Sequence, residues 1–393
     1  MYEGSTTVET LSQGHFFQYI HDFEILNNED VYFCGERYEW DGNYNTVLKG
    51  VFIGHFTMTD FRNTPQGGFL NIDTIPLLNI IGLIHTKKMD VFSDNIGVIH
   101  VVVTANAPNG SYIVDAYTSG GGSWDVVTTP GVSQSETYDD VAITENFVIV
   151  SARSVSKSPG SILVFDKPTS GASVFPPPMV SFTRVTLPYS VDGEILLEAC
   201  ENDVFVSACH SAGDSAIYIS GFDGTTHLST IGMPLNNSLS PSSQLKDISY
   251  SPYMQDLEIL QYSLFGYDTA SIVYHIRPNV LVDPNPVVYG NYYKCQTLCS
   301  IVNKRYLNGY TFASGHPFMP CYNEPNNNYH VLRKYVLLQG SFGNCTKKRE
   351  SAIWIYEKNP SVSDDGFYRS PHTKSEGAWP WVKSKGDVDI ICN

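Results

Sequence analysis

Residues 140–167 read DVAITENFVIVSARSVSKSPGSILVFDK and contain three β-rich runs separated by two polar turns. Branched and aromatic apolar residues predominate in each run, which is typical of strands. Glu145 and Asn146 form the first turn, and a segment of Ser, Pro and Gly forms the second. The stretch therefore predicts three consecutive strands, each antiparallel to the next.

The third run recurs six times along the chain, each time as a small residue followed by a β-rich segment. The copies are GVFIGHF from Gly50, SYIVDAY from Ser111, SILVFDK from Ser161, SAIYISG from Ser215, SIVYHIR from Ser271 and SAIWIYE from Ser351. Their spacings are 61, 50, 54, 56 and 80 residues. An all-strand repeat of about 40 to 50 residues or more is typical of a β-propeller. We therefore expect an all-β fold in which residues 1–393 form one β-propeller domain, with six blades preferred and seven as the alternative.

Two further strands precede each copy, and a fourth strand is expected after it. Expected first strands begin at Asp22, Gly82, Asp140, Glu194, Asp247 and Leu298, and expected second strands at Asp30, Gly97, Phe147, Asp203, Asp256 and Gly309. Expected fourth strands begin at Phe69, Ser123, Phe182 and His227.

The longest spacing predicts an insertion in the sixth blade, between its second and third strands. We place this inserted loop or hairpin at residues 316–349, with the apolar run YHVLRKYVLLQG from Tyr329 as an extra hairpin arm. The alternative is that this run is a blade strand and that a seventh, partial blade follows. A terminal strand must also close the ring, and either HFFQYI from His15 or DVDIICN from Asp387 could supply it.

The composition limits the classes of partner and location. A net charge of -16, with no Lys and Arg cluster longer than 347–349, excludes nucleic acid. The apolar run LLNIIGLI from Leu77 is far shorter than the roughly 20 residues of a transmembrane helix, so we expect no transmembrane segment. Low charge, abundant Tyr and eight Cys favour an extracytoplasmic location, in the cell envelope, periplasm or outer surface, with an export signal already removed. The oligomeric state stays open.

A resemblance supports the same location. The strand DVYFCG from Asp30, followed by KGVFIGHF from Lys49, resembles repeats in uncharacterised secreted β-propeller proteins of gut anaerobic bacteria. The resemblance covers mainly the first blade and the general repeat plan. It implies a propeller fold and a bacterial envelope location, and it carries no activity over to particular residues.

Two long connections suggest where a ligand binds. Connections between second and third strands all open on one face of a propeller, and two of them are long here: ERYEWDGNYNTVL from Glu36 and the insertion from His316. The first and sixth of six blades are neighbours, so we expect these segments to meet. The candidate ligand-binding residues that they carry are Glu36, Tyr38, Glu39, Trp40, Asp41, Tyr44, Phe318, Tyr322, Glu324 and Tyr329.

Aromatic side chains beside carboxylates and amides suit a glycan or a peptide. Alternatively, these aromatics only pack the two long segments against each other. We therefore predict a non-enzymatic binding or scaffold protein of the bacterial cell envelope that uses one propeller face. The alternative is a carbohydrate-active enzyme, a glycoside hydrolase or lyase, with Glu36, Glu39 or Asp41 as acid and base. Such an enzyme needs two carboxylates about 5 to 10 Å apart across the cleaved bond.

Metal binding is a weaker hypothesis. Asp22, Asp140 and Asp247 occupy equivalent places at the start of first strands, beside the central channel, where three carboxylates could hold Ca²⁺. The structural alternative is that each carboxylate accepts hydrogen bonds from nearby backbone. No cofactor is required, and the sequence contains no nucleophile elbow, phosphate loop, HExxH motif or dinucleotide fingerprint.

Cys321 and Cys345 are predicted to form a disulfide if the protein matures in an oxidising compartment. Both lie in the inserted segment, and the bond would close a loop of about 25 residues and stabilise the fold by roughly 3 to 4 kcal/mol. Peptide mapping without reductant should recover the two cysteines in one linked peptide. Recovery of both as alkylated thiols from oxidised protein would contradict the pairing.

Overall fold

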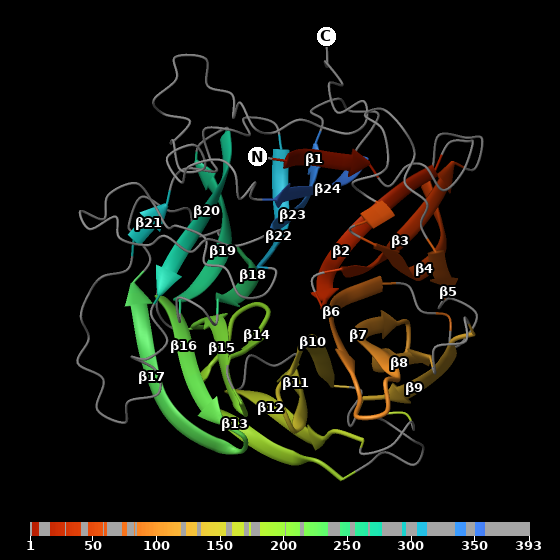
Figure 1. The fold of residues 1–393 in the computed structure, drawn as a ribbon. Helices are drawn as coiled ribbons and strands as arrows, with labels where there is room; N and C mark the ends of the chain where they lie inside the picture. The colour runs from red at the N-terminus through yellow and green to blue at the C-terminus, as the bar shows by residue number, and fades with distance from the viewer. Residues whose placement is uncertain are drawn as a thin grey trace.

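Six four-stranded antiparallel sheets surround a central axis, which is the architecture of a β-propeller (Figure 1). The computed structural model describes residues 2–7, most of residues 16–251 and the strand residues between 256 and 357. Regular secondary structure in these residues is strand, apart from a helical turn at Thr59 and Asp60. The innermost strand of each sheet contacts the innermost strand of both neighbours, so the ring is closed.

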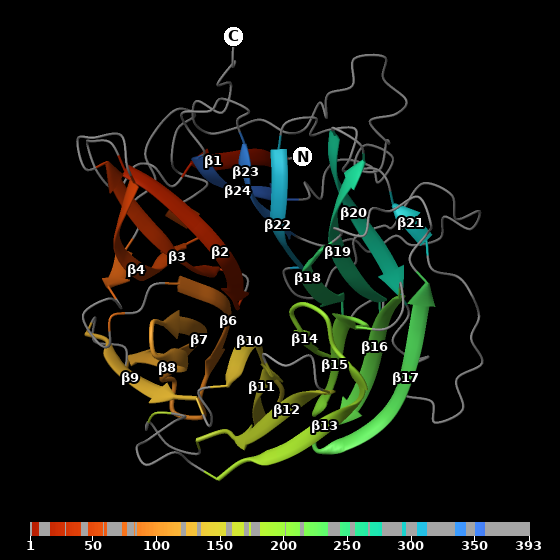
Figure 2. The same cartoon turned by 180° about the vertical axis from the view of Figure 1, so that it is seen from behind.

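Each blade is a meander of four strands, and its first strand lies nearest the axis (Figure 2). Blade 1 consists of β2 (Phe16–Leu26), β3 (Asp30–Trp40), β4 (Thr46–Thr57) and β5 (Asp73–Pro76), and blade 2 of β6 (His85–Ser93), β7 (Ile99–Ala107), β8 (Gly110–Thr118) and β9 (Asp125–Pro130). Blade 3 consists of β10 (Glu136–Ile143), β11 (Phe147–Ser154), β12 (Pro159–Asp166) and β13 (Thr183–Ser190), and blade 4 of β14 (Leu196–Ala199), β15 (Val204–His210), β16 (Ala216–Asp223) and β17 (Thr226–Pro234). Blade 5 consists of β18 (Gln244–Ser251), β19 (Asp256–Phe265), β20 (Asp268–Ile276) and β21 (Tyr293–Cys295), and blade 6 of β22 (Arg305–Phe312), β23 (Tyr335–Phe342), β24 (Glu350–Glu357) and β1 (Tyr2–Thr7).

The repeat predicted from the sequence is confirmed. All six copies of the quoted pattern coincide with third strands, which are β4, β8, β12, β16, β20 and β24. The predicted fourth strands coincide with β5, β9, β13 and β17. Two of the predicted turns contain a residue in the left-handed region, Asn27 with a φ of 53° and Asn202 with a φ of 56°. Asn tolerates this conformation better than most residues, which explains its use there.

Blade 6 corrects the sequence prediction by one strand. GYTFASG from Gly309, predicted as a second strand, belongs to the first strand β22, and the apolar run predicted as an extra hairpin arm contains the second strand β23. The long connection, residues 313–334, therefore joins the first and second strands, whereas the prediction put an insertion at 316–349 between the second and third. The apolar run is a blade strand, but no additional sheet follows it in the described residues.

Ring closure also differs from the prediction. The N-terminal strand β1 pairs antiparallel with β24 and completes blade 6, from Tyr2 opposite Glu357 to Thr7 opposite Ala352. HFFQYI, one predicted closing strand, instead forms the start of the first strand β2. The other, DVDIICN from Asp387, lies outside the described residues.

The core lies between the blades, because both faces of each sheet pack against a neighbouring sheet. Along β7, for example, Val101 and Val103 pack toward blade 1, while Val102 packs toward Tyr138 of blade 3. This explains why the strands read as nearly continuous apolar runs. Blades 3 and 4 meet through residues such as Ile149, Leu197 and Phe205, all of them fully or almost fully buried.

One close approach requires a glycine. The ring of Phe33 lies against Gly54 on the next strand, and a Cβ atom at residue 54 would come 2.2 Å from that ring. The pattern GVFIGHF therefore carries a glycine at its fifth position for a packing reason, since Phe33 is fully buried and has no room to move.

Five of the six inner strands contain a β-bulge, and β14 does not. The register shifts lie between Ile20 and Asp22 in β2, Thr86 and Met89 in β6, Tyr138 and Val141 in β10, Leu245 and Asp247 in β18, and Leu307 and Gly309 in β22. A bulge changes the direction of the side chains around it. In blades 1 to 3 it lets an inner-strand carboxylate reach the adjacent blade.

These carboxylates join consecutive blades by accepting a backbone N–H from the next inner strand. The bonds join Asp22 Oδ2 to Met89 N at 2.8 Å, Asp90 Oδ2 to Ile143 N at 2.7 Å, and Asp140 Oδ2 to Leu197 N at 2.7 Å. Blades 1 to 4 are therefore linked in series by one type of contact, which we call the inter-blade latch.

The latch corrects the metal hypothesis for Asp22 and Asp140. Asp22 also accepts from the Lys88 ammonium at 3.2 Å, and Asp140 also accepts from the Val141 N–H at 2.7 Å. Both carboxylates are buried and engaged with protein donors, so their role is structural. The side chain of Asp247 lies outside those described. In the described part of the chain, no three His, Cys, Asp or Glu side chains are grouped so that they could hold a metal ion.

Replacing a latch carboxylate should destabilise the ring. Asp140→Ala leaves the N–H groups of Leu197 and Val141 without their acceptor, so we expect a loss of about 1 to 3 kcal/mol in the free energy of unfolding. Urea unfolding followed by fluorescence would measure it. Asp166→Ala removes an exposed carboxylate at the end of β12 and serves as the control, with an expected change within about 0.5 kcal/mol. Equal stability of the two variants would contradict the latch.

Candidate functional site

The structure gives Glu36 a role different from the predicted one. Glu36 lies within β3 and is buried, not part of an exposed loop. Its Oε1 accepts from the His85 ring, with Nδ1 at 2.6 Å, and lies 3.1 Å from Nε2 of His21. The carboxylate therefore connects blade 1 to blade 2, and it does not face a ligand as a free acid or base.

Of the other predicted site residues, three lie in β3, and the rest lie outside the described residues. Tyr38, Glu39 and Trp40 extend β3 beyond Glu36, so the long predicted loop is mostly a paired hairpin in which Trp40 lies opposite Thr46. The side chains of these three residues lie outside those described. Asp41, Tyr44, Phe318, Tyr322, Glu324 and Tyr329 lie outside the described residues, as do Cys321 and Cys345.

The two predicted segments also leave the ring at opposite faces. The second strand β3 ends at Trp40, whereas the first strand β22 ends at Phe312. Inner strands run in the same direction around a propeller, and second strands run antiparallel to them, so these two strand ends lie on opposite faces. A shared surface built from both segments, as the sequence predicted, is not supported by this topology.

A different set of polar side chains gathers where the inner strands begin. Asp139, in the bulge of β10, accepts from Lys87 Nζ at 2.7 Å, Arg153 Nε at 2.9 Å and Arg153 Nη2 at 3.2 Å, and also from the backbone N–H of Ile195 at 3.3 Å. Glu194 Oε1 lies 3.6 Å from Lys87 Nζ. We call Lys87, Asp139, Arg153 and Glu194 the Asp139 cluster. It joins blades 2, 3 and 4 through a single buried carboxylate.

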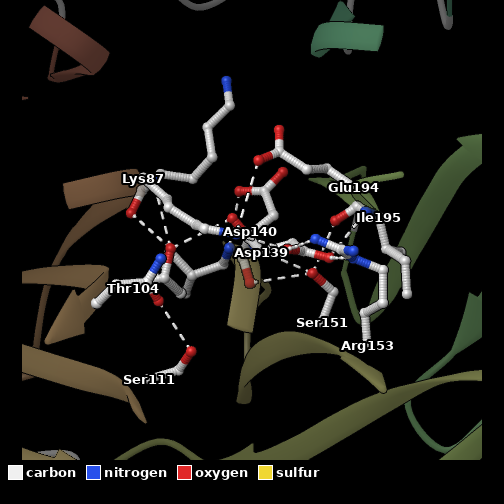
Figure 3. Close-up of polar contacts among 12 residues, drawn as sticks. Lys87, Thr104, Ser111, Asp139, Asp140, Ser151, Arg153, Glu194 and Ile195 are labelled. Carbon is white, nitrogen blue, oxygen red and sulfur yellow. Dashed lines mark hydrogen bonds and ion pairs between the residues drawn. The ribbon is translucent and has the colours of Figure 1, made fainter. Parts of the chain in front are cut away.

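Figure 3 shows the arrangement, with Asp139 and Asp140 in the middle, Lys87 and Thr104 on the side of blade 2, and Glu194 and Ile195 on the side of blade 4. The Asp139 side chain has an exposure of 0%, whereas Lys87, Arg153 and Glu194 have exposures of 15%, 27% and 46%. The cluster is therefore layered. A buried carboxylate holds two partly exposed cations, and an exposed carboxylate lies beside them.

The bulges explain how neighbouring residues take part in different contacts. Lys87 pairs with Asp139 of blade 3, while Lys88 pairs with Asp22 of blade 1. Asp139 binds the cations, while its neighbour Asp140 forms the latch to blade 4. Regular alternation alone would not produce these pairs, because it takes no account of the one extra residue in each bulge.

The surroundings of Arg153 are acidic. The hydrogen bond to Asp139 raises the pKa of the Arg153 guanidinium, burial lowers it to a smaller extent, and the charges of Asp139, Glu194 and Asp192 raise it further. The guanidinium and the Lys87 ammonium are therefore positioned cations whose charges are already compensated by protein carboxylates. Such groups can donate hydrogen bonds to a neutral polar ligand in a fixed geometry.

Sequence reasoning missed the Asp139 cluster. Lys87, Arg153 and Glu194 belong to no motif, and their meeting depends on the angle between three blades. The available signal was the pair Asp139 and Asp140 at the start of an expected inner strand, since Asp is depleted in strands and two in succession are unusual there.

The strand histidines His55 and His100 are packed or hydrogen-bonded. His100 is fully buried, contacts Asp115 through Nδ1 at 3.2 Å, and stacks on the ring of Phe92 at a centroid distance of 4.6 Å. His55 Nε2 lies 3.0 Å from Asp30 Oδ1. The side chain of His275 lies outside those described. His55 and His100 therefore contribute contacts between strands.

Two cysteine thiols are also structural. Burial raises the pKa of Cys209 to about 12 and also raises the pKa of Cys34, so both thiols stay protonated at neutral pH. Protonated, buried thiols are poor nucleophiles. Neither residue therefore supplies covalent catalysis.

Comparison with known proteins concerns the fold. No protein-family model matches the chain, and no curated protein matches it. Among solved structures, the chain is similar to a protein of unknown function from Dyadobacter fermentans, with a TM-score of 0.52 and 10% sequence identity over 91% of this chain and 98% of the other. At this identity the similarity establishes the propeller fold and no activity.

The chain is also similar, at lower TM-scores, to solved structures of both binding proteins and enzymes. A fungal lectin from Aleuria aurantia, described as a six-bladed β-propeller with a novel mode of fucose recognition, gives a TM-score of 0.45 at 10% identity, covering 88% of this chain and 97% of the other. A Hadza microbial sialidase gives a TM-score of 0.49 at 10% identity, covering 87% of this chain and 66% of the sialidase chain. TM-scores below 0.5 do not choose between the two classes. The propeller part of the resemblance drawn from the sequence is confirmed, while an origin in gut anaerobes and secretion stay predictions.

The Asp139 cluster should be required for the packing of blades 2 to 4. Asp139→Asn leaves Lys87 and Arg153 without their shared buried anion, and we expect a loss of about 2 to 4 kcal/mol in the free energy of unfolding. Glu194→Gln alters only an exposed ion pair and should change stability by less than about 1 kcal/mol. Chemical denaturation of both variants measures the difference. An Asp139→Asn variant as stable as Glu194→Gln would show that the cluster does not hold the blades together.

Proposed function

We propose that this protein is a non-enzymatic, extracytoplasmic glycan-binding protein, and that the glycan binds over the Asp139 cluster at the face where the inner strands begin. The observation that carries the proposal is the layered cluster itself: two partly exposed cations are fixed by a fully buried carboxylate, with an exposed carboxylate adjacent. Fixed donors beside a fixed acceptor suit sugar hydroxyls, which both donate and accept.

The hairpin of blade 1 adds a second element at the same face. β3 continues four residues past Glu36 and ends at Trp40, and second strands end at the face where inner strands begin. Trp40, one of the binding residues predicted from the sequence, therefore ends a strand at the same face as the cluster, and we propose to test it beside the cluster. Aromatic rings commonly act as anchors at binding surfaces.

Binding is favoured over hydrolysis by the state of the buried carboxylates. A glycosidase needs two carboxylates that face the cleaved bond, one of them able to give and take a proton. Glu36 is occupied by two imidazoles, and Asp139 by a lysine, an arginine and a backbone N–H. Among the described residues of the two sets, Glu194 is the one carboxylate with substantial exposure. Hydrolysis is therefore kept as an outcome that the test can reveal.

Removing the partly exposed guanidinium of Arg153 should weaken glycan binding at some cost in stability, because it also removes one of the two cations paired with buried Asp139. We expect Arg153→Ala to weaken binding of any glycan that the wild-type protein retains by about tenfold or more, because a charged donor is lost. Glycan-array screening identifies the ligand, and titration calorimetry measures its affinity. Arg184→Ala is the matched control, since Arg184 also pairs with a carboxylate, Glu136, but lies on the outer strand β13.

The same titrations distinguish the alternatives. Unchanged affinity in Arg153→Ala, with full loss in Trp40→Ala, would move the site to the hairpin. Release of reducing sugar from a bound glycan would identify an enzyme. Absence of glycan binding by the folded wild-type protein would overturn the proposed function.

A further inference from the structure

The charge balance of the Asp139 cluster says which kind of glycan fits. Lys87 and Arg153 contribute two positive charges, and the buried carboxylate of Asp139 compensates one of them. Glu194 and Asp192 are both exposed and add negative charge near Arg153, and Glu194 also lies beside Lys87. Two cations thus face three carboxylates, in a chain whose net charge is -16. The cluster therefore has no positive charge left to attract an anionic ligand.

The separation of Lys87 and Glu194 suggests a specific contact. Lys87 Nζ and Glu194 Oε1 are 3.6 Å apart, which is longer than the roughly 2.7 to 3.2 Å of a direct hydrogen bond. A ligand hydroxyl that lies to one side of both atoms, about 2.8 Å from each, can accept from the ammonium and donate to the carboxylate at the same time. A carboxylate or sulfate in that position can only accept, so it would leave Glu194 without a donor and would repel it.

We propose that the site selects uncharged, hydroxyl-rich glycans against acidic ones, and that Glu194 is the residue that determines this selectivity. This inference rests on the proposed function. Glu194 is well suited to the role because it follows Gly193, whose φ of 104° gives the short turn between blades 3 and 4 a backbone conformation that few other residues adopt. The turn ends immediately before the buried Ile195, so the position of Glu194 is fixed by the core beneath it.

The test compares matched ligands. Titration calorimetry is carried out with neutral oligosaccharides from the array and with the corresponding oligosaccharides in which one hexose is replaced by its uronic acid. We expect the neutral member of each pair to bind about tenfold or more tightly at low salt. The gap should narrow when ionic strength rises from about 0.05 M to about 0.5 M, because salt screens repulsion between exposed charges.

Two substitutions separate charge from shape. Glu194→Gln keeps the size of the side chain and a carbonyl acceptor but removes the charge. It should lower the affinity for the neutral oligosaccharide and reduce the affinity difference between the neutral and the acidic oligosaccharide. Asp166→Asn removes an exposed carboxylate from the end of β12, outside the Asp139 cluster, and should leave both affinities unchanged. Tighter binding of the acidic member by the wild-type protein, or unchanged discrimination in Glu194→Gln, would overturn the inference. A failure of every glycan to bind would instead overturn the proposed function.

Discussion

The contact on which this ring depends is the hydrogen bond from a backbone N–H of one inner strand to a carboxylate of the preceding blade. Among the described strands, no backbone ladder joins one sheet to the next, although single backbone bonds such as Glu145 N–H to Asn202 O do cross between blades. Apolar packing between sheets supplies most of the burial, but it has no direction and would allow blades to slide. The carboxylates of Asp22, Asp90 and Asp140 fix the position of each next strand with bonds of 2.7 to 2.8 Å. The bulges in β2, β6 and β10 are what let these side chains reach.

The same constraint creates the candidate site. A bulge contributes an additional side chain, and in blade 3 that side chain is Asp139, buried between two neighbouring blades. A buried carboxylate needs compensation, which it receives from Lys87 and Arg153. Their ends stay partly exposed at the face where the inner strands begin. Two fixed cations at the surface are thus a consequence of how the blades are joined, and binding can use groups that folding already required.

The sequence predicted the repeat well because third strands are buried on both faces and carry a strong apolar pattern, as in SILVFDK from Ser161. It failed where neighbouring segments have equal β-propensity: RYLNGYTF and YVLLQGSF both form strands, and only pairing assigns them as first and second. The closing strand YEGSTT has little apolar character, and its place follows from the unpaired edge of β24. Asp22 and Asp140 were placed correctly beside the axis, but their partners lie on other blades, at sequence distances that no local pattern encodes.

The Asp139 cluster also shows why a group of acidic and basic side chains need not be a catalytic centre. Catalysis by carboxylates requires that a proton be gained and lost near neutral pH, and this requires a pKa that the surroundings leave adjustable. Asp139 accepts from four donor atoms, and Glu36 lies beside two imidazoles, so both carboxylates are engaged in contacts within the protein. Recognition makes no such demand, because donors and acceptors that keep their charge and position are what a binding surface needs.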